Sequence, residues 1–344
     1  MEKYKKYTDA GTGINPFTPY IGTNEGGNKI KHIINVLLMP IMISLKIVPL
    51  IMMGILWFGL EKFGGIMGST IKDRMIGMVA LIILKIFGFF NLQHQTLDKH
   101  MKKTNGTSYN SGDLIISNHV SYLDVIYWVY KANNPIFAAI TTQDIFSKPK
   151  IIEMSGWKYM WNMIYNKEIK FSDKRAKQLS DAIKTTKKTV IIFPEGTTTN
   201  GRGIMQFASV FINNSGIQSD SEDDEEEQEE QTMVGNIIQQ RGGKIHVVGI
   251  RYGNGRTQSP AYHHTQPIMN HILYNIAELT NTMEIYEYAP EKETNLSFLI
   301  EKSRHLITKL FGVKNIPMLQ STRKDKASFL KYWTLTQQKA YHSK

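Results

Sequence analysis

The stretch NHVSYLD, residues 118 to 124, contains residue types that perform acid–base chemistry. His119 has an imidazole that can accept a proton near neutral pH, and Asp124 has a carboxylate that can fix the tautomer of an imidazole. The stretch follows DLIIS, an apolar run that is typical of a strand. Because polar groups of α/β sheets gather where strands end and helices begin, we expect His119 and Asp124 to lie at such a point.

The spacing of the two residues decides how they can meet. Five residues along one helix would separate His119 and Asp124 by about 140° around the helix axis, so a shared helix cannot pair them. A turn over residues 118–121 can instead fold His119 back over the first turn of a helix that starts near Tyr122. One imidazole nitrogen then binds Asp124 and the other acts as a base. The alternative is a helix cap at Asn118 with a solvated histidine beside it.

A second polar motif follows TVIIF, the strand-like run of residues 189–193. Pro194, Glu195 and Gly196 come directly after it and lead into three threonines. Backbone amides and hydroxyls crowded at the end of a strand are suited to gripping a phosphate or another polar headgroup. The alternative is an ordinary turn with a solvated glutamate. Two such motifs, each after an apolar strand, favour a functional site over two unrelated turns.

Several kinds of chemistry are not indicated. The chain has no cysteine, which excludes disulfides, thiolate zinc sites and a cysteine nucleophile. There is no G-x-S-x-G elbow, no Walker phosphate loop and no G-x-G-x-x-G after a strand. The histidine pair at residues 263–264 is interpreted as a surface pair and not as a metal site, because neighbouring side chains diverge on a regular element. We therefore expect no metal and no bound cofactor.

The charge of the chain is unevenly distributed. Nine of its 30 acidic residues lie in DSEDDEEEQEE, residues 220–230, which contain no base. The other 21 acidic residues are set against 41 basic ones, so the rest of the chain has a net charge of +20. A basic body favours nucleic acid, anionic lipid or a polyanionic substrate. Because no nucleic-acid-binding signature is present, we do not expect nucleic acid as a partner.

Two apolar runs precede the motifs, at residues 33–60 and 75–90. The first contains only one charge, Lys46, and two prolines, Pro40 and Pro49, that should kink a helix. It is long enough for the roughly 30 Å of a bilayer core, and the second run is short for a full span. We interpret them as a membrane-associated helical hairpin, spanning or re-entrant, whose basic flanks place both outer ends on the cytosolic side. The alternative is a pair of buried core helices.

From residue 113 onward, short strand-like runs alternate with helical ones. Strands are expected at 113–117, 135–141, 189–193, 244–252 and 282–288, and helices at 122–132 and 151–165. This alternation predicts an α/β fold, with a mixed, largely parallel sheet flanked by helices.

Changes in composition and hydropathy along the sequence also predict a division of the chain into segments. The expected segments are a polar N-terminal segment (1–30), the hairpin (31–92), a catalytic domain (93–320) with a disordered acidic insertion (212–243), and a basic amphipathic helix (321–344).

NHVSYLD and, further along the chain, FPEGTTTNG resemble the first and third motifs of the glycerophospholipid acyltransferase family, NHxxxxD and FPEGT. The resemblance covers roughly residues 110–255, and the motifs occur in the family's order behind an apolar hairpin. The stretch MEKYKKYTDAGTGINPFTP is similar to the N-terminus of the fungal lysophosphatidate acyltransferases of the endoplasmic reticulum and lipid droplets.

The resemblance implies a reaction that agrees with the reading of the first motif. His119, oriented by Asp124, would remove the proton from a free hydroxyl of a lysophospholipid. The oxygen would then attack the thioester of an acyl-coenzyme A, with no acyl-enzyme intermediate. The residues that the resemblance assigns to the substrates are Asn118, Glu195, Gly196 and Thr197.

Two positions depart from the family pattern. The second motif of the family usually ends in an arginine that meets the acceptor phosphate, and alignment by eye puts Lys167 there, with Arg175 as a fallback. A lysine binds phosphate as a point charge, without the bidentate fork of arginine. The fourth motif usually has a proline where this chain has Val247, although Arg251 and Tyr252 follow the pattern, and Arg251 is added to the expected substrate-binding residues. The choice of headgroup stays open for this reason.

The sequence thus leads to the expectation of a membrane enzyme that converts lysophosphatidate to phosphatidate, with acyl-coenzyme A as co-substrate and membrane lipid as its environment. One alternative is a different acceptor, lysophosphatidylinositol or lysophosphatidylethanolamine. Another is a lipid-binding membrane protein without catalytic activity. The expected location is the endoplasmic reticulum or the lipid droplet, with the catalytic domain facing the cytosol.

Overall fold

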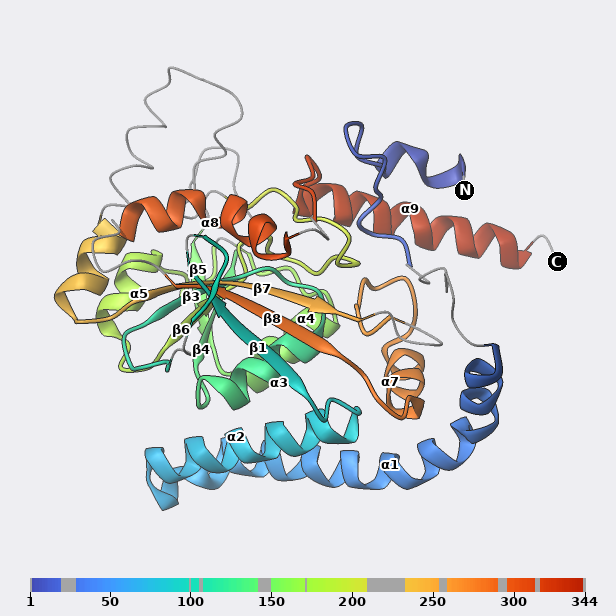
Figure 1. Cartoon of the computed structure of the whole chain (residues 1–344), viewed down its shortest axis with the longest axis horizontal. Coiled ribbons are helices and arrows are strands. Elements are labelled where there is room, and N and C mark those ends of the chain that lie inside the picture. The colour runs from blue at the N-terminus through green and yellow to red at the C-terminus, as the bar shows by residue number, and fades with distance from the viewer. Residues whose placement is uncertain are drawn as a thin grey trace.

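A computed structural model of the chain describes residues 2–19, 29–98, 100–104, 108–141, 150–170, 172–208, 233–253, 259–289, 296–312 and 316–342. Within these residues one eight-stranded sheet lies between two layers of helices (Figure 1). Helices α1 and α2 form an outer layer on one side of the sheet, and α8 lies on the other side.

The sheet is mixed. Its strands are β1 (Leu92–Leu97), β2 (Lys103–Thr104), β3 (Leu114–Ser117), β4 (Ile136–Ile140), β5 (Ile151–Met154), β6 (Val190–Ile192), β7 (Ile245–Tyr252) and β8 (Met283–Tyr288), in the spatial order β2-β1-β8-β7-β3-β6-β4-β5. The central strands β7, β3, β6 and β4 run parallel to one another. The antiparallel pairs are β1 with β2, β4 with β5, and β7 with β8. The expected α/β class with a mixed, largely parallel sheet is confirmed.

All five expected strands are present, as β3, β4, β6, β7 and β8, and two other features differ. Residues 151–165 were expected to be helical throughout, but they begin with strand β5 and only then form α4 (Gly156–Ile164). Strand β1 was not expected, because its sequence LQHQTL is polar. It pairs with β8 on one side and β2 on the other, so long-range pairing overrides its weak local strand signal.

Each face of the sheet carries its own hydrophobic core, and successive strand residues alternate between them. Ile115 of β3 belongs to the core beneath α1 (Lys29–Phe63), α2 (Ser69–Ile86), α3 (Tyr122–Lys131), α4 and α7 (Ile268–Ala277). Its neighbours Leu114 and Ile116 belong to the core beneath α5 (Leu179–Thr185) and α8 (Leu296–Leu310). All three strand residues are fully buried, which accounts for the continuous apolar runs of the central strands.

The apolar runs of the N-terminal part form a pair of helices, α1 and α2, joined by the short helix η2 (Gly64–Met67). Helix α1 continues through Pro40 and Pro49 and is visibly bent (Figure 1). Helix α2 buries Ile76, Ala80 and Leu84 in the same core as Ile115, so this helix contacts the domain directly. This contact agrees with the alternative that the two apolar runs are core helices.

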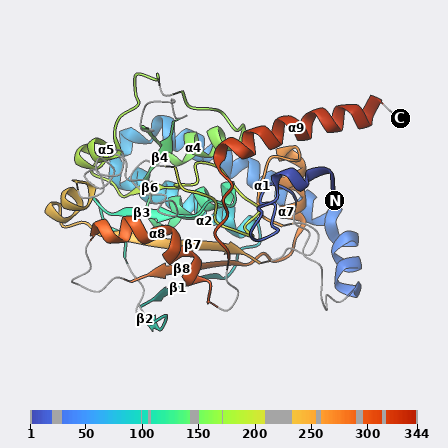
Figure 2. The same cartoon turned by 90° about the horizontal axis from the view of Figure 1, so that it is seen from above.

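The long tail helix α9 (Arg323–His342) packs against the N-terminal segment, including the short helix η1 (Glu2–Tyr7) (Figures 1 and 2). Phe329 of α9, Phe17 and Met205 form a small third core, with Tyr4, Tyr7 and Trp333 packed around it. The tail therefore caps the domain on one face, which was one of the two roles open to it.

Only the last part of the expected disordered insertion, 212–243, lies within the described residues, and that part is ordered. Residues 209–232, which include the acidic run, lie outside the described residues. Residues 233–240 form a helix whose Val234, Ile237 and Ile238 are buried in the second core. The sequence did not indicate this helix, because polar residues surround its short apolar pattern. The expected C-terminal boundary of the insertion, residue 243, is therefore wrong.

A buried ionic network holds the amino ends of β3 and β7 to β8. His246 lies between two carboxylates, with Nδ1 2.6 Å from Glu287 Oε1 and Nε2 3.2 Å from Asp113 Oδ2. Burial alone would lower the pKa of His246, but the hydrogen bonds to Asp113 and Glu287 outweigh it and raise that pKa above its ordinary value. The imidazolium form therefore offsets the cost of burying two carboxylates.

We expect His246→Leu to lower the free energy of unfolding by about 3–5 kcal/mol, because Asp113 loses its imidazolium partner and Glu287 loses one of its partners, although it keeps its bonds to His94 and the Tyr109 hydroxyl. Since the folded-state pKa of His246 is raised, its stabilisation is complete below the unfolded value of 6.5 and is lost as the pH rises through the folded value. Urea unfolding in detergent at a series of pH values measures both effects. The exposed His100→Leu is the matched control, and equal pH dependence in the wild type and His246→Leu would contradict the assignment.

Candidate active site

His119 and Asp124 meet as their spacing predicted. Strand β3 ends at Ser117 and helix α3 begins at Tyr122, and the turn between them brings His119 Nδ1 to 2.9 Å from Asp124 Oδ2. Both side chains are fully buried.

Asp124 also caps helix α3, whereas the alternative of a cap at Asn118 beside a solvated histidine is wrong, because Asn118 bonds Ile250 and His119 is buried. Asp124 Oδ2 accepts hydrogen bonds from the backbone amides of Val120 (2.7 Å) and Ser121 (2.8 Å), in a capping box with Ser121 as the N-cap. Its Oδ1 accepts from the Tyr252 hydroxyl at the end of β7 (2.5 Å). The carboxylate that orients His119 is thus fixed by a helix on one side and a strand on the other.

The second nitrogen of His119 is free. Its Nε2 is buried and has no hydrogen-bond partner among the described residues, while the ring stacks on Phe193 with 4.1 Å between ring centroids. Burial lowers the pKa of His119 below its ordinary value, against the raising effect of Asp124. A neutral imidazole that donates from Nδ1 to the carboxylate carries its lone pair on Nε2. This is the arrangement that a general base requires.

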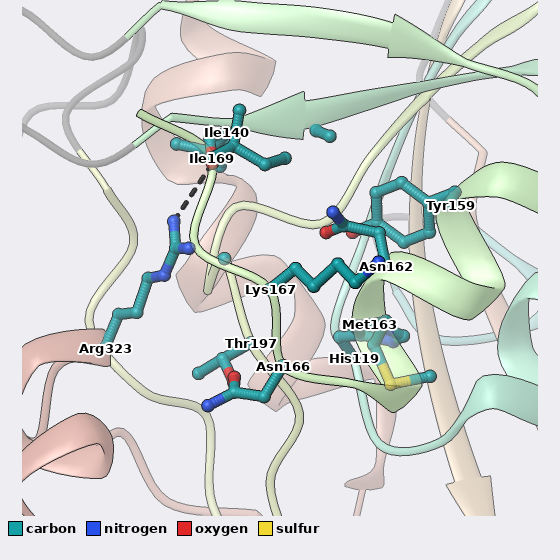
Figure 3. A pocket seen from close by; sticks show the side chains of 12 residues that line it. His119, Ile140, Tyr159, Asn162, Met163, Asn166, Lys167, Ile169, Thr197 and Arg323 are labelled. Atoms are coloured by element: carbon teal, nitrogen blue, oxygen red, sulfur yellow. Dashed lines mark hydrogen bonds between the residues drawn. The ribbon is translucent and has the colours of Figure 1, made fainter. Parts of the chain in front are cut away.

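His119 lines a narrow cavity (Figure 3). The cavity has a volume of about 30 Å³, which is enough to hold a water molecule. Its walls come from α4 and the segment after it, from the loop after β6, from the end of β4, and from α9. The lining residues are His119, Ala139, Ile140, Tyr159, Asn162, Met163, Asn166, Lys167, Ile169, Gly196, Thr197 and Arg323. Of the expected substrate-binding residues, the structure brings Lys167, Gly196 and Thr197 together with His119.

Glu195 and Asn118 have positions different from those expected. Glu195 does not line the cavity, since its two oxygens accept from the backbone amides of His119 and Met205, each at 2.9 Å. Burial raises its pKa to about 7, against the lowering effect of these two hydrogen bonds. The Asn118 amide bonds both backbone groups of Ile250 on β7, at 2.7 and 2.9 Å. Both side chains thus hold the backbone around His119 and are not exposed to a substrate.

The two arginines considered from sequence lie elsewhere. Arg251 on β7 pairs with Glu284 on β8, and its guanidinium lies over the ring of Phe311. Arg175 is exposed and bonds Asp173, with Nη2 2.7 Å from Oδ2. Neither arginine lines the cavity, so the structure does not bring Arg251 or Arg175 together with His119, and Lys167 is the better placed of the two alternatives from the second motif.

Sequence reasoning missed two cations of helix α9. Arg323 lines the cavity, and Lys326 is buried with its Nζ on Thr198, 2.6 Å from the carbonyl oxygen and 2.9 Å from Oγ1. Burial lowers the pKa of Lys326 to about 7, against the raising effect of Glu195. The one sequence feature that pointed to Arg323 and Lys326 was their spacing of three residues, which puts both side chains on one face of a helix.

The histidine pair at 263–264 is not at the surface. His263 is 3% exposed, and His264 Nε2 lies 2.7 Å from the Met163 carbonyl oxygen. The backbone of His264 has a φ of 67°, so the pair does not lie on the regular helix or strand that the expectation of a surface pair assumed. In the described part of the chain, no group of three or more histidine, aspartate or glutamate side chains is arranged to hold a metal ion.

The fold and the site therefore define a protein of the α/β class with a buried histidine–aspartate pair beside a polar strand-end loop. Residues 96–214 match the Acyltransferase family. A Schizosaccharomyces pombe protein named "Putative lysophosphatidic acid:oleoyl-CoA acyltransferase" is 30% identical over 215 residues, which are 61% of this chain and 68% of that protein. No solved structure matches the chain. The chain belongs to the acyltransferase family.

We expect His119→Ala to lower the rate of acyl transfer by about 10²–10⁴, the usual contribution of a general base. Asp124→Asn should also be severe, because the imidazole loses the carboxylate that fixes its tautomer. Activity of each purified variant, at matched thermal stability, measures the effect. The exposed His305→Ala is the control and should keep full activity.

The pH profile gives a second test of the same assignment. A base works in its neutral form, and the pKa of His119 is lowered from 6.5, so kcat/KM should rise with pH only below 6.5 and stay level just above it. An acid limb centred well above 6.5, or activity of His119→Ala within a few-fold of the wild type, would remove His119 from the mechanism.

Proposed function

We propose that this enzyme transfers the acyl group of an acyl-coenzyme A to the free hydroxyl of lysophosphatidate, which forms phosphatidate. The free Nε2 of His119 beside Gly196, Thr197 and a lysine is the observation that carries the proposal. It supplies a base for the hydroxyl and a cation for the phosphate in one cavity. The family of the chain and the name of the fission yeast relative support the same reaction.

In this proposal His119 Nε2 takes the proton of the hydroxyl as its oxygen attacks the thioester carbonyl carbon. The carbon–sulfur bond then breaks, and the proton passes from Nε2 to the departing sulfur, which leaves as free coenzyme A. Asp124 stabilises the imidazolium that exists between these steps. No covalent intermediate on the protein and no further cofactor are needed.

The acceptor phosphate is assigned to Lys167. It lies in the segment after α4, and among the described residues no carboxylate pairs with it. Its ammonium is 5.6 Å from the centroid of the Tyr165 ring. An ammonium without a carboxylate partner at the wall of the cavity is available for a phosphate.

The enzyme is also proposed to act at a membrane. Leu37–Met67 is the one segment of the described chain that is long and apolar enough to cross a bilayer. One face of α1 packs on the domain through Ile47 and Trp57, and Lys46 Nζ donates to the Glu278 carbonyl oxygen at 2.8 Å. The opposite face is exposed and apolar, with Leu45 66% and Ile55 67% exposed.

A helix held along the domain at its midpoint cannot cross a bilayer unless the domain enters it. We therefore propose that α1 and α2 lie in one leaflet, with the exposed face in the acyl-chain region. The proposed location is the cytosolic face of the endoplasmic reticulum or of lipid droplets.

The direct test of the proposed reaction uses purified protein in detergent, oleoyl-coenzyme A and a panel of lysophospholipids with different headgroups. Products are identified by mass spectrometry. Phosphatidate should form fastest. Preference for a lysophospholipid with a larger headgroup would overturn the assignment of the acceptor while leaving the acyl transfer intact.

For the acceptor cation, we expect Lys167→Met to raise the KM for lysophosphatidate about tenfold or more, since a charge-assisted hydrogen bond contributes about 1.5–3 kcal/mol. Lys167→Arg should be tolerated, because it keeps the charge and adds a fork. Arg175→Met is the control and should leave both KM values unchanged, because Arg175 is exposed and outside the cavity. A rise in the KM for acyl-coenzyme A instead would assign Lys167 to the other substrate.

For membrane association, we expect the double variant Leu45→Lys/Ile55→Lys to move from the membrane to the soluble fraction. A lysine in the acyl-chain region costs up to about 2.5–3.5 kcal/mol at the centre of the bilayer. Flotation with liposomes measures the fraction bound. Gln239→Lys/Gln240→Lys adds the same charge on an exposed surface and should stay bound. Equal binding of the two double variants would show that the exposed face of α1 is not the membrane surface.

A further inference from the structure

Helix α9 reaches the cavity although it lies outside the residues that match the family. Its inner face carries Arg323, Lys326 and Phe329, and it starts beside the loop that follows β6 (Figures 1 and 2). Lys326 fixes the helix to that loop through its two hydrogen bonds to Thr198. Arg323, one turn earlier, is therefore held at the cavity by a buried contact.

Arg323 lies between the end of β4 and the loop after β6 (Figure 3). Its Nη1 donates to the Ile140 carbonyl oxygen at 3.0 Å, and a side chain at Gly196 would meet its Cδ at 3.3 Å. The stem of Arg323 thus packs closely on the backbone at Gly196. Its Nε and Nη2 donate to none of the described residues, and no described carboxylate forms an ion pair with it.

A guanidinium in this position is costly without an anion. Burial lowers the pKa of Arg323, against the raising effects of Tyr159 and Glu168. A cation that is partly removed from water and has no carboxylate partner becomes favourable when an anion binds it. The loop itself, PEGTTTN, contains no basic residue, so Arg323 brings a positive charge to a place where the loop provides only amides and hydroxyls.

We propose that Arg323 binds the phosphate of the acyl acceptor together with Lys167, so that α9 completes the acceptor site. This inference rests on the proposed function and names a second residue for its phosphate. Lys167 and Arg323 reach the same cavity from different elements (Figure 3), and Gly196 and Thr197 of the loop after β6 also line it.

The position of His119 distinguishes the acceptor phosphate from the phosphates of coenzyme A. In lysophosphatidate the reactive hydroxyl and the phosphate ester are on neighbouring carbons, so the phosphate must lie in the same cavity as the base that takes the hydroxyl proton. In acyl-coenzyme A the whole pantetheine arm separates the thioester from the phosphates. A cation that shares a narrow cavity with His119 Nε2 is therefore placed for the acceptor.

The test compares Arg323→Gln, Arg323→Lys and the control Lys324→Gln, all in the full-length protein. Glutamine removes the charge and keeps a polar side chain, but its amide nitrogen ends two bonds short of the guanidinium nitrogen that donates to the Ile140 carbonyl oxygen. Lys324 is the exposed neighbour on the same helix, and its substitution removes the same charge outside the cavity. Steady-state kinetics give the KM for both substrates, and calorimetry gives the affinity for a short-chain lysophosphatidate without any turnover.

We expect Arg323→Gln to raise the KM and the Kd for lysophosphatidate roughly tenfold, the loss that follows from one charge-assisted hydrogen bond. The KM for acyl-coenzyme A should change less than about twofold. The pantetheine arm keeps the coenzyme A phosphates away from the thioester, and so away from Arg323. Arg323→Lys should fall between the wild type and Arg323→Gln, and Lys324→Gln should match the wild type.

Three outcomes would overturn the inference. Unchanged values in Arg323→Gln would show that Arg323 does not bind the acceptor. A rise confined to acyl-coenzyme A would assign Arg323 to coenzyme A phosphates, and the same defect in Lys324→Gln would show a general effect of net charge. If the wild type binds lysophosphatidate through Arg323 but does not acylate it, the proposed function fails while the binding site stands.

Discussion

The carboxylate of Asp124 joins the turn that contains His119, helix α3 and strand β7. It accepts from His119 Nδ1, from two backbone amides at the start of α3 and from the Tyr252 hydroxyl. A carboxylate with a single partner could rotate, and the imidazole would rotate with it. With four donors around its two oxygens, it has one orientation, and the orientation of His119 follows from it. The sheet and α3 together thus determine where Nε2 points.

Glu195 and Asn118, two other polar residues of the motifs, form hydrogen bonds to backbone groups. Glu195 links the amide of His119 to that of Met205, and Asn118 extends the pairing of β3 with β7 by bonding Ile250 with its side chain. These contacts bring the two motif loops together at the carboxyl ends of parallel strands. His119 contributes the one side-chain nitrogen of NHVSYLD that faces the cavity. The motifs therefore specify a rigid loop pair more than a set of groups that touch substrate.

The sequence predicted what depends on neighbouring residues. The ends of β3 and the start of α3 followed from an apolar run and a turn, and the pairing of His119 with Asp124 followed from their spacing. Features that depend on distant partners were missed. Strand β1 is polar and exists through pairing with β8, and Arg251 is engaged by Glu284 across the sheet. The place of Arg323 in the cavity depends on the packing of α9, which no local pattern encodes.

The attachment of α9 to the loop after β6 has a consequence for the order of events during synthesis. The apolar helices α1 and α2 emerge from the ribosome before the sheet, whereas α9 emerges after every strand. Thr198 receives the buried ammonium of Lys326 only once α9 has left the ribosomal tunnel. In the proposed membrane placement, the growing chain reaches the bilayer through its first helices while the loop beside His119 still lacks its contact with α9. If α1 and α2 lie in a leaflet as proposed, attachment to lipid comes first and the cavity beside His119 is completed last, so an incomplete chain at the membrane has no complete cavity.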